Sequence, residues 1–155
     1  MRSICALECC FCPDVHAMIG ILIVAHGSLA DSLVECATHV LGQQPRGLAT
    51  LDFIGHADPN ERQKALQAKL AELDEGDGIL VLTDVYGATP SNVLCRVLAP
   101  AHIEGISGVN LPMLLKALNY RDTLPLLQLV ERIVEGGRSS INHISETMCH
   151  AATGR

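Results

Sequence analysis

The chain has 155 residues, of which 48% are apolar and 3% aromatic, and this composition fits one domain with an aliphatic core. A formal net charge of -6 argues against nucleic acid as a partner, because neutralising phosphates requires clustered Lys and Arg. No apolar run approaches the ~18 residues needed to span a bilayer, so direct membrane insertion is not expected.

The seven cysteines form no recognisable disulfide framework. Four of them crowd the N-terminus, and the other three are scattered through the chain, where cysteine usually serves as a small buried hydrophobe. This usage indicates a reducing compartment, the cytoplasm. The N-terminal group is Cys5, Cys9, Cys10 and Cys12, and the scattered ones are Cys36, Cys95 and Cys149.

The first seventeen residues are set apart from the rest of the sequence. The run Cys9-Cys10-x-Cys12 could attract a soft metal, but it lacks two spaced Cys-x-x-Cys pairs. Since a strand pattern begins directly after Met18, we expect residues 1–17 to be a disordered or misassigned extension. Residues 18–137 would then form the domain, and 138–155 a C-terminal tail.

Strand and helix patterns alternate through the first half of the domain. The β-branched run from Ile19 to Ala25 predicts a strand covered on both faces, and a second strand is expected over Leu48 to Ile54. Between them, apolar residues at helical spacing from Leu29 to Leu41 predict a helix that Gly42 ends. Asp58-Pro59-Asn60-Glu61 marks the next helix start, whose expected buried stripe is Leu66, Leu70 and Leu73.

The second half continues the alternation, with strands expected over Gly78 to Thr83 and within His102 to Ser107. The sequence therefore predicts a single-domain α/β fold: an open, mainly parallel sheet of about four strands with helices on both faces. The expected helices run from Thr89-Pro90 to Leu98 before Pro100, from Leu111 to Tyr120, and from Pro125 to Glu135 with Gly136-Gly137 as the stop. An extra edge strand is expected over Arg138 to Ile144.

Polar and glycine-containing loops follow three of the predicted strands. In open α/β sheets, ligands bind beyond the carboxyl ends of the strands. His26-Gly27-Ser28 follows the first strand, Asp84 follows the third, and Gly108-Val109-Asn110 follows the fourth. We therefore expect these loops to converge on one site.

A histidine beside an aspartate is a chemical unit. The carboxylate of Asp84 can accept the Nδ1 proton of His26, which leaves Nε2 as a nucleophile. A phosphoryl group on Nε2 would need N–H and hydroxyl donors, and the helix start at Thr89 offers some of them. No Lys or Arg is near these loops in sequence, which suits transient storage of phosphate. The expected phosphate-contacting residues are Gly27, Ser28, Gly87, Ala88 and Thr89, with Tyr86 and Asn110 on the partner face.

Each of these residues alone has a simpler interpretation: a loop histidine, a strand-ending aspartate or a helix cap. Their coincidence in three loops favours a functional site.

The three segments resemble signatures of the mannose-family IIA domains of the bacterial sugar phosphotransferase system. These are the segments 21–27, 83–92 and 108–114, and the likeness spans about residues 18–137. The resemblance implies that His26 is phosphorylated through Nε2 by the carrier HPr, with Asp84 orienting it and no cofactor. It also implies a IIB domain as acceptor, expected on another chain, and a homodimer with exchanged C-terminal strands.

The sequence departs from the family pattern at three positions. Val85 stands where members can carry a hydroxyl residue, Ala88 replaces the second glycine, and Tyr86 replaces the usual tryptophan. The poor match of the tail weakens the implied strand exchange.

Three alternatives remain open at this point. The domain could donate phosphate to a dihydroxyacetone kinase, or serve as a regulatory binding module that phosphorylation of His26 switches. A metal-binding protein using His26, His56 and the N-terminal cysteines is the least favoured alternative, because these residues lack metal-site spacing.

Overall fold

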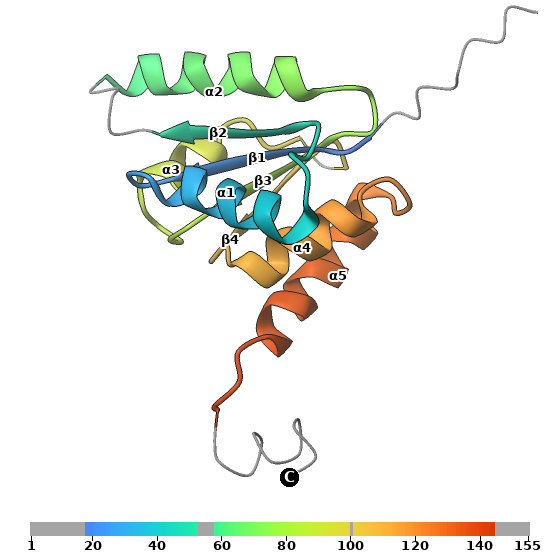
Figure 1. The fold of residues 1–155 in the computed structure, drawn as a ribbon. Helices are drawn as coiled ribbons and strands as arrows, with labels where there is room; N and C mark the ends of the chain where they lie inside the picture. Colours follow the sequence, from blue (N-terminus) through green and yellow to red (C-terminus); the bar gives the residue numbers. More distant parts are fainter. Residues whose placement is uncertain (1–17, 53–57, 100, 145–155) are drawn as a thin grey trace, which may run out of the picture.

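The computed structural model describes residues 18–52, 58–99 and 101–144 as a four-stranded parallel sheet flanked by helices (Figure 1). All three strand pairings are parallel, and the strand order is β2-β1-β3-β4. The α/β fold expected from the sequence is confirmed. The strands are β1 (Gly20–Ala25), β2 (Leu48–Asp52), β3 (Ile79–Thr83) and β4 (Ile103–Ser107).

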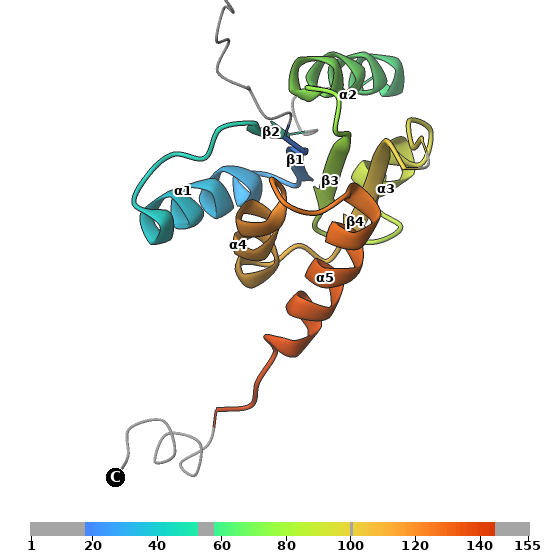
Figure 2. The same ribbon diagram turned by 90° about the vertical axis from the view of Figure 1, so that its right-hand side faces the viewer.

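Helices cover both faces of the sheet, as Figures 1 and 2 show. Helices α1, α4 and α5 pack on one face, and α2 and α3 pack on the other. The helices are α1 (Leu29–Leu41), α2 (Pro59–Leu73), α3 (Thr89–Leu94), α4 (Leu111–Tyr120) and α5 (Leu126–Ser139).

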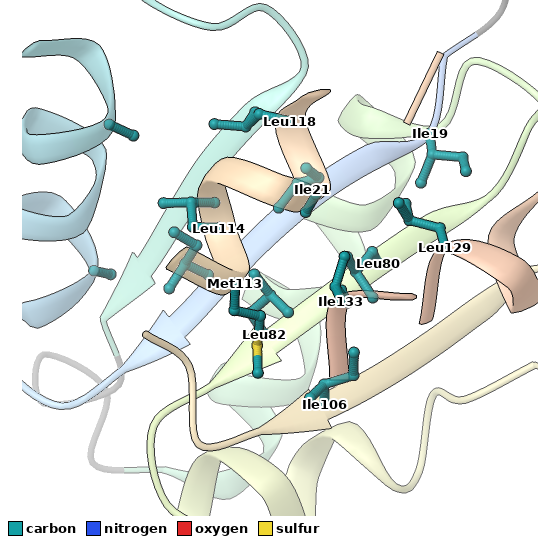
Figure 3. Close-up of a cluster of buried hydrophobic side chains, with 14 of the residues drawn as sticks. Ile19, Ile21, Leu80, Leu82, Ile106, Met113, Leu114, Leu118, Leu129 and Ile133 are labelled. Carbon is teal, nitrogen blue, oxygen red and sulfur yellow. The ribbon is translucent and has the colours of Figure 1, made fainter. Parts of the chain in front are cut away.

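The apolar run of β1 divides between two cores. Successive side chains of a strand point to opposite faces, so Ile21 and Ile23 join the core under α1, α4 and α5. Leu22 and Val24 join the core under α2 and α3. All four side chains are at most 1% exposed, which explains why this strand shows no polar alternation. Figure 3 shows the first core, where side chains of the strands meet those of α4 and α5.

Local signals set most helix ends. The side chain of Asp58 accepts a hydrogen bond from the N–H of Asn60 at 2.9 Å, as expected of an N-cap before Pro59. Gly42 ends α1 in the left-handed conformation, with φ of 72°. The predicted stripe of Leu66, Leu70 and Leu73 on α2 is buried.

The Gly136-Gly137 pair does not end α5, contrary to the sequence-based expectation, because the helix continues to Ser139. Both glycines are buried where α5 crosses α4. A Cβ atom on Gly137 would lie 2.7 Å from the terminal methyl of Met113, and one on Gly136 would overlap Lys116. The pair therefore serves the close approach of two helices.

Two further expectations are corrected. Helix α3 ends at Leu94, before the predicted Leu98, because the chain then tightens into turns in which the N–H groups of Arg96 and Val97 bond to carbonyls three residues back. No strand forms over residues 140–144, and Arg138 and Ser139 belong to α5. A strand needs an edge to pair with, and this tail leads away from the sheet (Figures 1 and 2). Pro100 lies outside the described residues.

Cys36 and Cys95 are exposed free thiols, so the expectation that the scattered cysteines are buried is wrong for both. Cys36 lies on α1, whose buried residues are Ala30 and Ala37. Val40 on the same helix is 56% exposed, so apolar residues of α1 other than Cys36 also reach solvent. Cys149 and residues 1–17 lie outside the described residues. In the part of the chain that the structure describes, no helix has both the length and the apolar character needed to cross a membrane.

Candidate functional site

The candidate site lies where the strand order of the sheet reverses. From β1 the chain moves outward to β2, then crosses to β3 on the other side of β1 and continues to β4. The carboxyl ends of β1 and β3 flank this switch point, which is the usual ligand position in open α/β sheets. His26 directly follows β1 and Asp84 directly follows β3.

The two side chains are in direct contact. Nδ1 of His26 lies 2.7 Å from Oδ2 of Asp84, and the backbone N–H of His26 donates to the same oxygen at 3.0 Å. The other oxygen, Oδ1, accepts a hydrogen bond from the N–H of Val85 at 2.8 Å. The His26 side chain is 51% exposed and that of Asp84 only 10%. The carboxylate is therefore enclosed, while the imidazole reaches solvent.

This geometry sets the tautomer of His26. Partial burial by itself raises the pKa of Asp84, but hydrogen bonds from the His26 backbone, the His26 ring and the Val85 backbone together hold that pKa below its ordinary value of 3.8. Asp84 is therefore ionised at neutral pH and can only accept hydrogen bonds. Nδ1 must carry the proton, which leaves the lone pair of the neutral ring on Nε2.

The third loop is tied to the same position by backbone hydrogen bonds. The N–H of Gly108 donates to the carbonyl of Asp84 at 3.1 Å, and the N–H of Val109 donates to Thr83 at 3.0 Å. Gly27 and Gly87 have φ of 58° and 80°, a region that favours glycine, so both turns require it. The structure thus brings together the three loops that the sequence singled out.

The other predicted residues occupy different surroundings. Ser28 is exposed beside His26, and Ala88 is partly buried in the loop before α3, which begins at Thr89. Tyr86 is 84% exposed next to Asp84. The side-chain oxygen of Asn110 caps α4 by accepting a hydrogen bond from Met113 N at 2.9 Å, a structural role that the sequence interpretation missed.

Two more features of the site escaped sequence reasoning. Helix α1 begins at Leu29, as predicted, but the sequence did not show that Ser28 at its N-cap position makes no side-chain capping bond. The amide nitrogen of Asn92 donates to the carbonyl of Gly87 at 3.2 Å and so braces the Gly87 turn. Ser28 directly follows the segment 21–27 and Asn92 ends the segment 83–92, and these positions were the available signal for both.

The metal alternative finds no support in the residues that can be described. Among residues 18–52, 58–99 and 101–144, no three His, Cys, Asp or Glu side chains gather as metal ligands would. His56 and the N-terminal cysteines lie outside these ranges.

Comparisons with known proteins identify the family to which the chain is similar. A family described as "PTS system fructose IIA component" matches residues 20–134. The "PTS system mannose-specific EIIAB component" of Escherichia coli is 36% identical over 125 residues, which are 79% of this chain and 38% of that protein. The "PTS system fructose-specific EIIA component" of Bacillus subtilis is 30% identical over 130 residues, covering 83% of this chain and 88% of that protein.

The fold is also found among solved structures. The phosphotransferase system component EIIA from Streptococcus agalactiae superposes with a TM-score of 0.72 and 31% identity, covering 81% of this chain and 97% of that one. The chain spans only 38% of the length of the mannose-specific EIIAB relatives, but 88% of the Bacillus subtilis EIIA component and 97% of the Streptococcus agalactiae protein. With its family match over most of the domain and the His26–Asp84 pair at the switch point, this chain belongs to the mannose-family IIA components of the phosphotransferase system.

Proposed function

We propose that this protein is a cytoplasmic phosphocarrier in sugar uptake, taking a phosphoryl group from phospho-HPr onto Nε2 of His26 and passing it to a IIB domain on another chain. The observation that carries the proposal is the 2.7 Å contact between Nδ1 of His26 and Oδ2 of Asp84. It leaves Nε2 unprotonated on a half-exposed ring that a partner can reach.

The transfer is an exchange of one phosphorus–nitrogen bond for another. The lone pair of Nε2 attacks phosphorus, a new bond to Nε2 forms, and the bond to the donor nitrogen breaks. As the bond forms, positive charge develops on the ring of His26, and the ionised Asp84 stabilises it through the Nδ1–H hydrogen bond. The protein contributes positioning and charge stabilisation, which are the main sources of catalysis in phosphoryl transfer.

Two groups of donors near His26 in the chain fold are proposed contacts for the phosphoryl oxygens. The start of α1 directly behind His26 brings backbone N–H groups and the positive end of a 13-residue helix. The Ser28 hydroxyl is not used for capping and can donate to a phosphoryl oxygen. Further proposed contacts are the backbones of Gly27, Gly87 and Ala88 and of Thr89, where α3 begins.

An apolar surface beside His26 suits protein partners. Val85 is 55% exposed and Tyr86 is 84% exposed, and both follow Asp84 in the same loop. Exposed aromatic residues are frequent anchors in protein interfaces. We assign this surface to docking of HPr and IIB, with Asn110 as a further proposed contact.

The test is phosphorylation in a purified system. The protein is incubated with phosphoenolpyruvate, enzyme I and HPr, and its mass is measured. We expect a gain of one acid-labile phosphoryl group in the wild type and none in His26→Ala. His102→Ala is the matched control, because His102 also pairs with an aspartate, with 2.8 Å between its Nε2 and Oδ2 of Asp74. Acid-labile phosphate retained by His26→Ala would refute the assignment.

We also propose that two copies form a homodimer through their C-terminal tails. Strand β4 lies at one edge of the sheet, and residues 140–144 lead away from their own domain (Figure 1). Ile141 and Ile144 are 81% and 78% exposed in the single chain, which favours burial against a second copy. Sedimentation velocity should give a dimer for the full chain and a monomer for a chain that ends at Ser140. A monomeric full chain would contradict this proposal.

A further inference from the structure

The tertiary structure brings Arg138 to the carboxyl edge of the sheet, where the candidate site lies. Arg138 belongs to the last turn of α5. That helix starts beside the beginning of β3, since a Cβ on Gly78 would lie 3.0 Å from the Leu126 side chain. It ends beyond β4, since a Cβ on Gly137 would lie 3.3 Å from Nδ2 of Asn110. Helix α5 therefore runs in the direction of the strands, and its last turn reaches the same edge as the site.

Arg138 lines a hollow beside the third loop of the site. The hollow has a volume of about 390 Å³ and lies between β4 and α5, which are neighbours in Figures 1 and 2. Ser107, Gly108 and Asn110 line it together with Arg138. The N–H of Gly108 donates to the carbonyl of Asp84 at 3.1 Å, so this wall of the hollow is joined directly to the site.

The charge of Arg138 is open to a partner. Its side chain is exposed, and a guanidinium stays protonated in proteins. Within residues 18–52, 58–99 and 101–144, Arg138 forms no ion pair. Glu135, one turn earlier on α5, lines a different hollow together with Lys116 and Arg132. The positive charge at the end of α5 is therefore not neutralised by its own helix.

Most other charges at this edge are negative. They are Asp84 in the site, Asp31 in the first turn of α1, Asp52 at the end of β2, and Asp58 and Glu61 at the start of α2. Arg62 on α2 has an interaction of its own. A phosphoryl group carries between about 1.5 and 2 negative charges at neutral pH, so these carboxylates oppose the approach of a phosphorylated protein. Arg138 offsets that repulsion.

We propose that Arg138 steers the phosphorylated donor protein onto His26. This role rests on the function proposed for His26 and adds the encounter step to it. Strand β4 is two places from β1, or about 10 Å, and packed layers lie about 10 Å apart, which puts the end of α5 roughly 15–20 Å from His26. A standard interface covers about 800 Å² per partner, a disc of roughly 16 Å radius. A donor centred on His26 therefore has Arg138 at its rim, where charges act mainly on the rate of association.

A purely structural role for Arg138 predicts a different result. A cation in the last turn of a helix stabilises the helix through the macrodipole. If that is its whole role, replacing Arg138 lowers the melting temperature slightly, and the rate of phosphoryl transfer depends neither on the charge at this position nor on salt. Steering predicts a rate that follows the charge and loses that dependence when salt screens it.

The experiment measures the second-order rate of phosphoryl transfer from phospho-HPr to the full-length protein by rapid quench. The variants are Arg138→Lys, Arg138→Gln and Arg138→Glu, each at an ionic strength of about 10 mM and about 0.5 M. Arg46→Glu is the matched control, because Arg46 is an exposed arginine before β2, at the opposite edge of the sheet, and the variant changes the net charge equally. Melting temperatures check that all variants are folded.

We expect the rate at low ionic strength to follow the charge at position 138. At this distance one unit of charge facing a dianion changes the encounter rate about 2-fold. Arg138→Lys should match the wild type, Arg138→Gln should be about 2-fold slower, and Arg138→Glu about 4-fold slower, while Arg46→Glu stays within about 1.5-fold. The differences should vanish at about 0.5 M, and the rate at saturating phospho-HPr should stay unchanged throughout, since Arg138 does not touch the reacting atoms.

Equal rates for the Lys, Gln and Glu variants at low ionic strength would overturn the proposal. A difference that persists at about 0.5 M, or an equal loss in Arg46→Glu, would also overturn it. A wild type that takes up no phosphate from phospho-HPr refutes the function proposed for His26 and, with it, the steering role. A wild type that is phosphorylated on His26 at a rate independent of the charge at position 138 refutes steering alone.

Discussion

Replacing Asp84 by asparagine leaves three N–H donors facing one acceptor oxygen instead of two. The N–H groups of the His26 backbone, the His26 ring and Val85 all point at the two carboxylate oxygens. An asparagine has one oxygen and one NH₂ group. If its NH₂ faces Val85, that backbone donor loses its partner. If its NH₂ faces His26, the ring must move its proton to Nε2, which is then no longer a nucleophile.

The size of the effect follows from the lost ionic hydrogen bond. A hydrogen bond to a charged group contributes about 1.5–3 kcal/mol, and each 1.36 kcal/mol in a barrier is roughly tenfold in rate. Loss of the Nδ1–H bond to an ionised Asp84 therefore slows transfer by roughly 10- to 150-fold. Because the wrong tautomer is populated as well, we expect about 10²-fold for Asp84→Asn.

The assay is rapid-quench measurement of phosphoryl transfer from phospho-HPr, combined with ¹⁵N NMR of the His26 ring nitrogens. Asp74→Asn is the matched control, since Asp74 also holds a histidine and a backbone N–H, at 2.8 and 3.0 Å, but lies at the other end of the sheet. The control should transfer at the wild-type rate. If Asp84→Asn keeps both the wild-type rate and the wild-type tautomer ratio, Asp84 merely ends a strand and the site is wrongly described.

Three further predictions concern stability. Gly20→Ala should lower the free energy of unfolding by about 2 kcal/mol, and the melting temperature by roughly 4–8 °C, because the new Cβ would lie 2.6 Å from the backbone oxygen of Leu73. An unchanged melting temperature would mean that α2 shifts at no cost. A chain that starts at Met18 should match the full chain in melting temperature and phosphorylation rate, and a loss of several degrees would show that residues 1–17 pack on the domain. The hydrogen bond from His102 lowers the pKa of Asp74 below 3.8, so its contribution to stability is present above that pH and lost as the pH falls through the lowered pKa. The stability difference between the wild type and Asp74→Asn, measured by urea unfolding, should therefore shrink below pH 4, and a difference that grows on acidification would contradict the pairing.

Much of the candidate site could be inferred from the chain itself. A histidine and an aspartate directly after two apolar runs had to lie at the same edge of a parallel sheet, since such strands end together. The sequence did not reveal that Asp84 receives three hydrogen bonds, or that Asn110 caps a helix, because such contacts depend on side-chain directions set by packing.

The sequence by itself determined the order and type of the elements from β1 to α5, the two-sided burial of β1, the cap at Asp58 and the end of α1 at Gly42. These depend on periodicity and on backbone preferences that act within a few residues. Only the tertiary structure decided that Gly136-Gly137 lies inside α5 and that α3 stops at Leu94. A glycine pair ends a helix when nothing else holds it, but contact with Lys116 and Met113 of α4 favours the helical conformation here. Tertiary packing outweighs local propensity wherever the burial gained exceeds the ~1 kcal/mol that glycine costs in a helix.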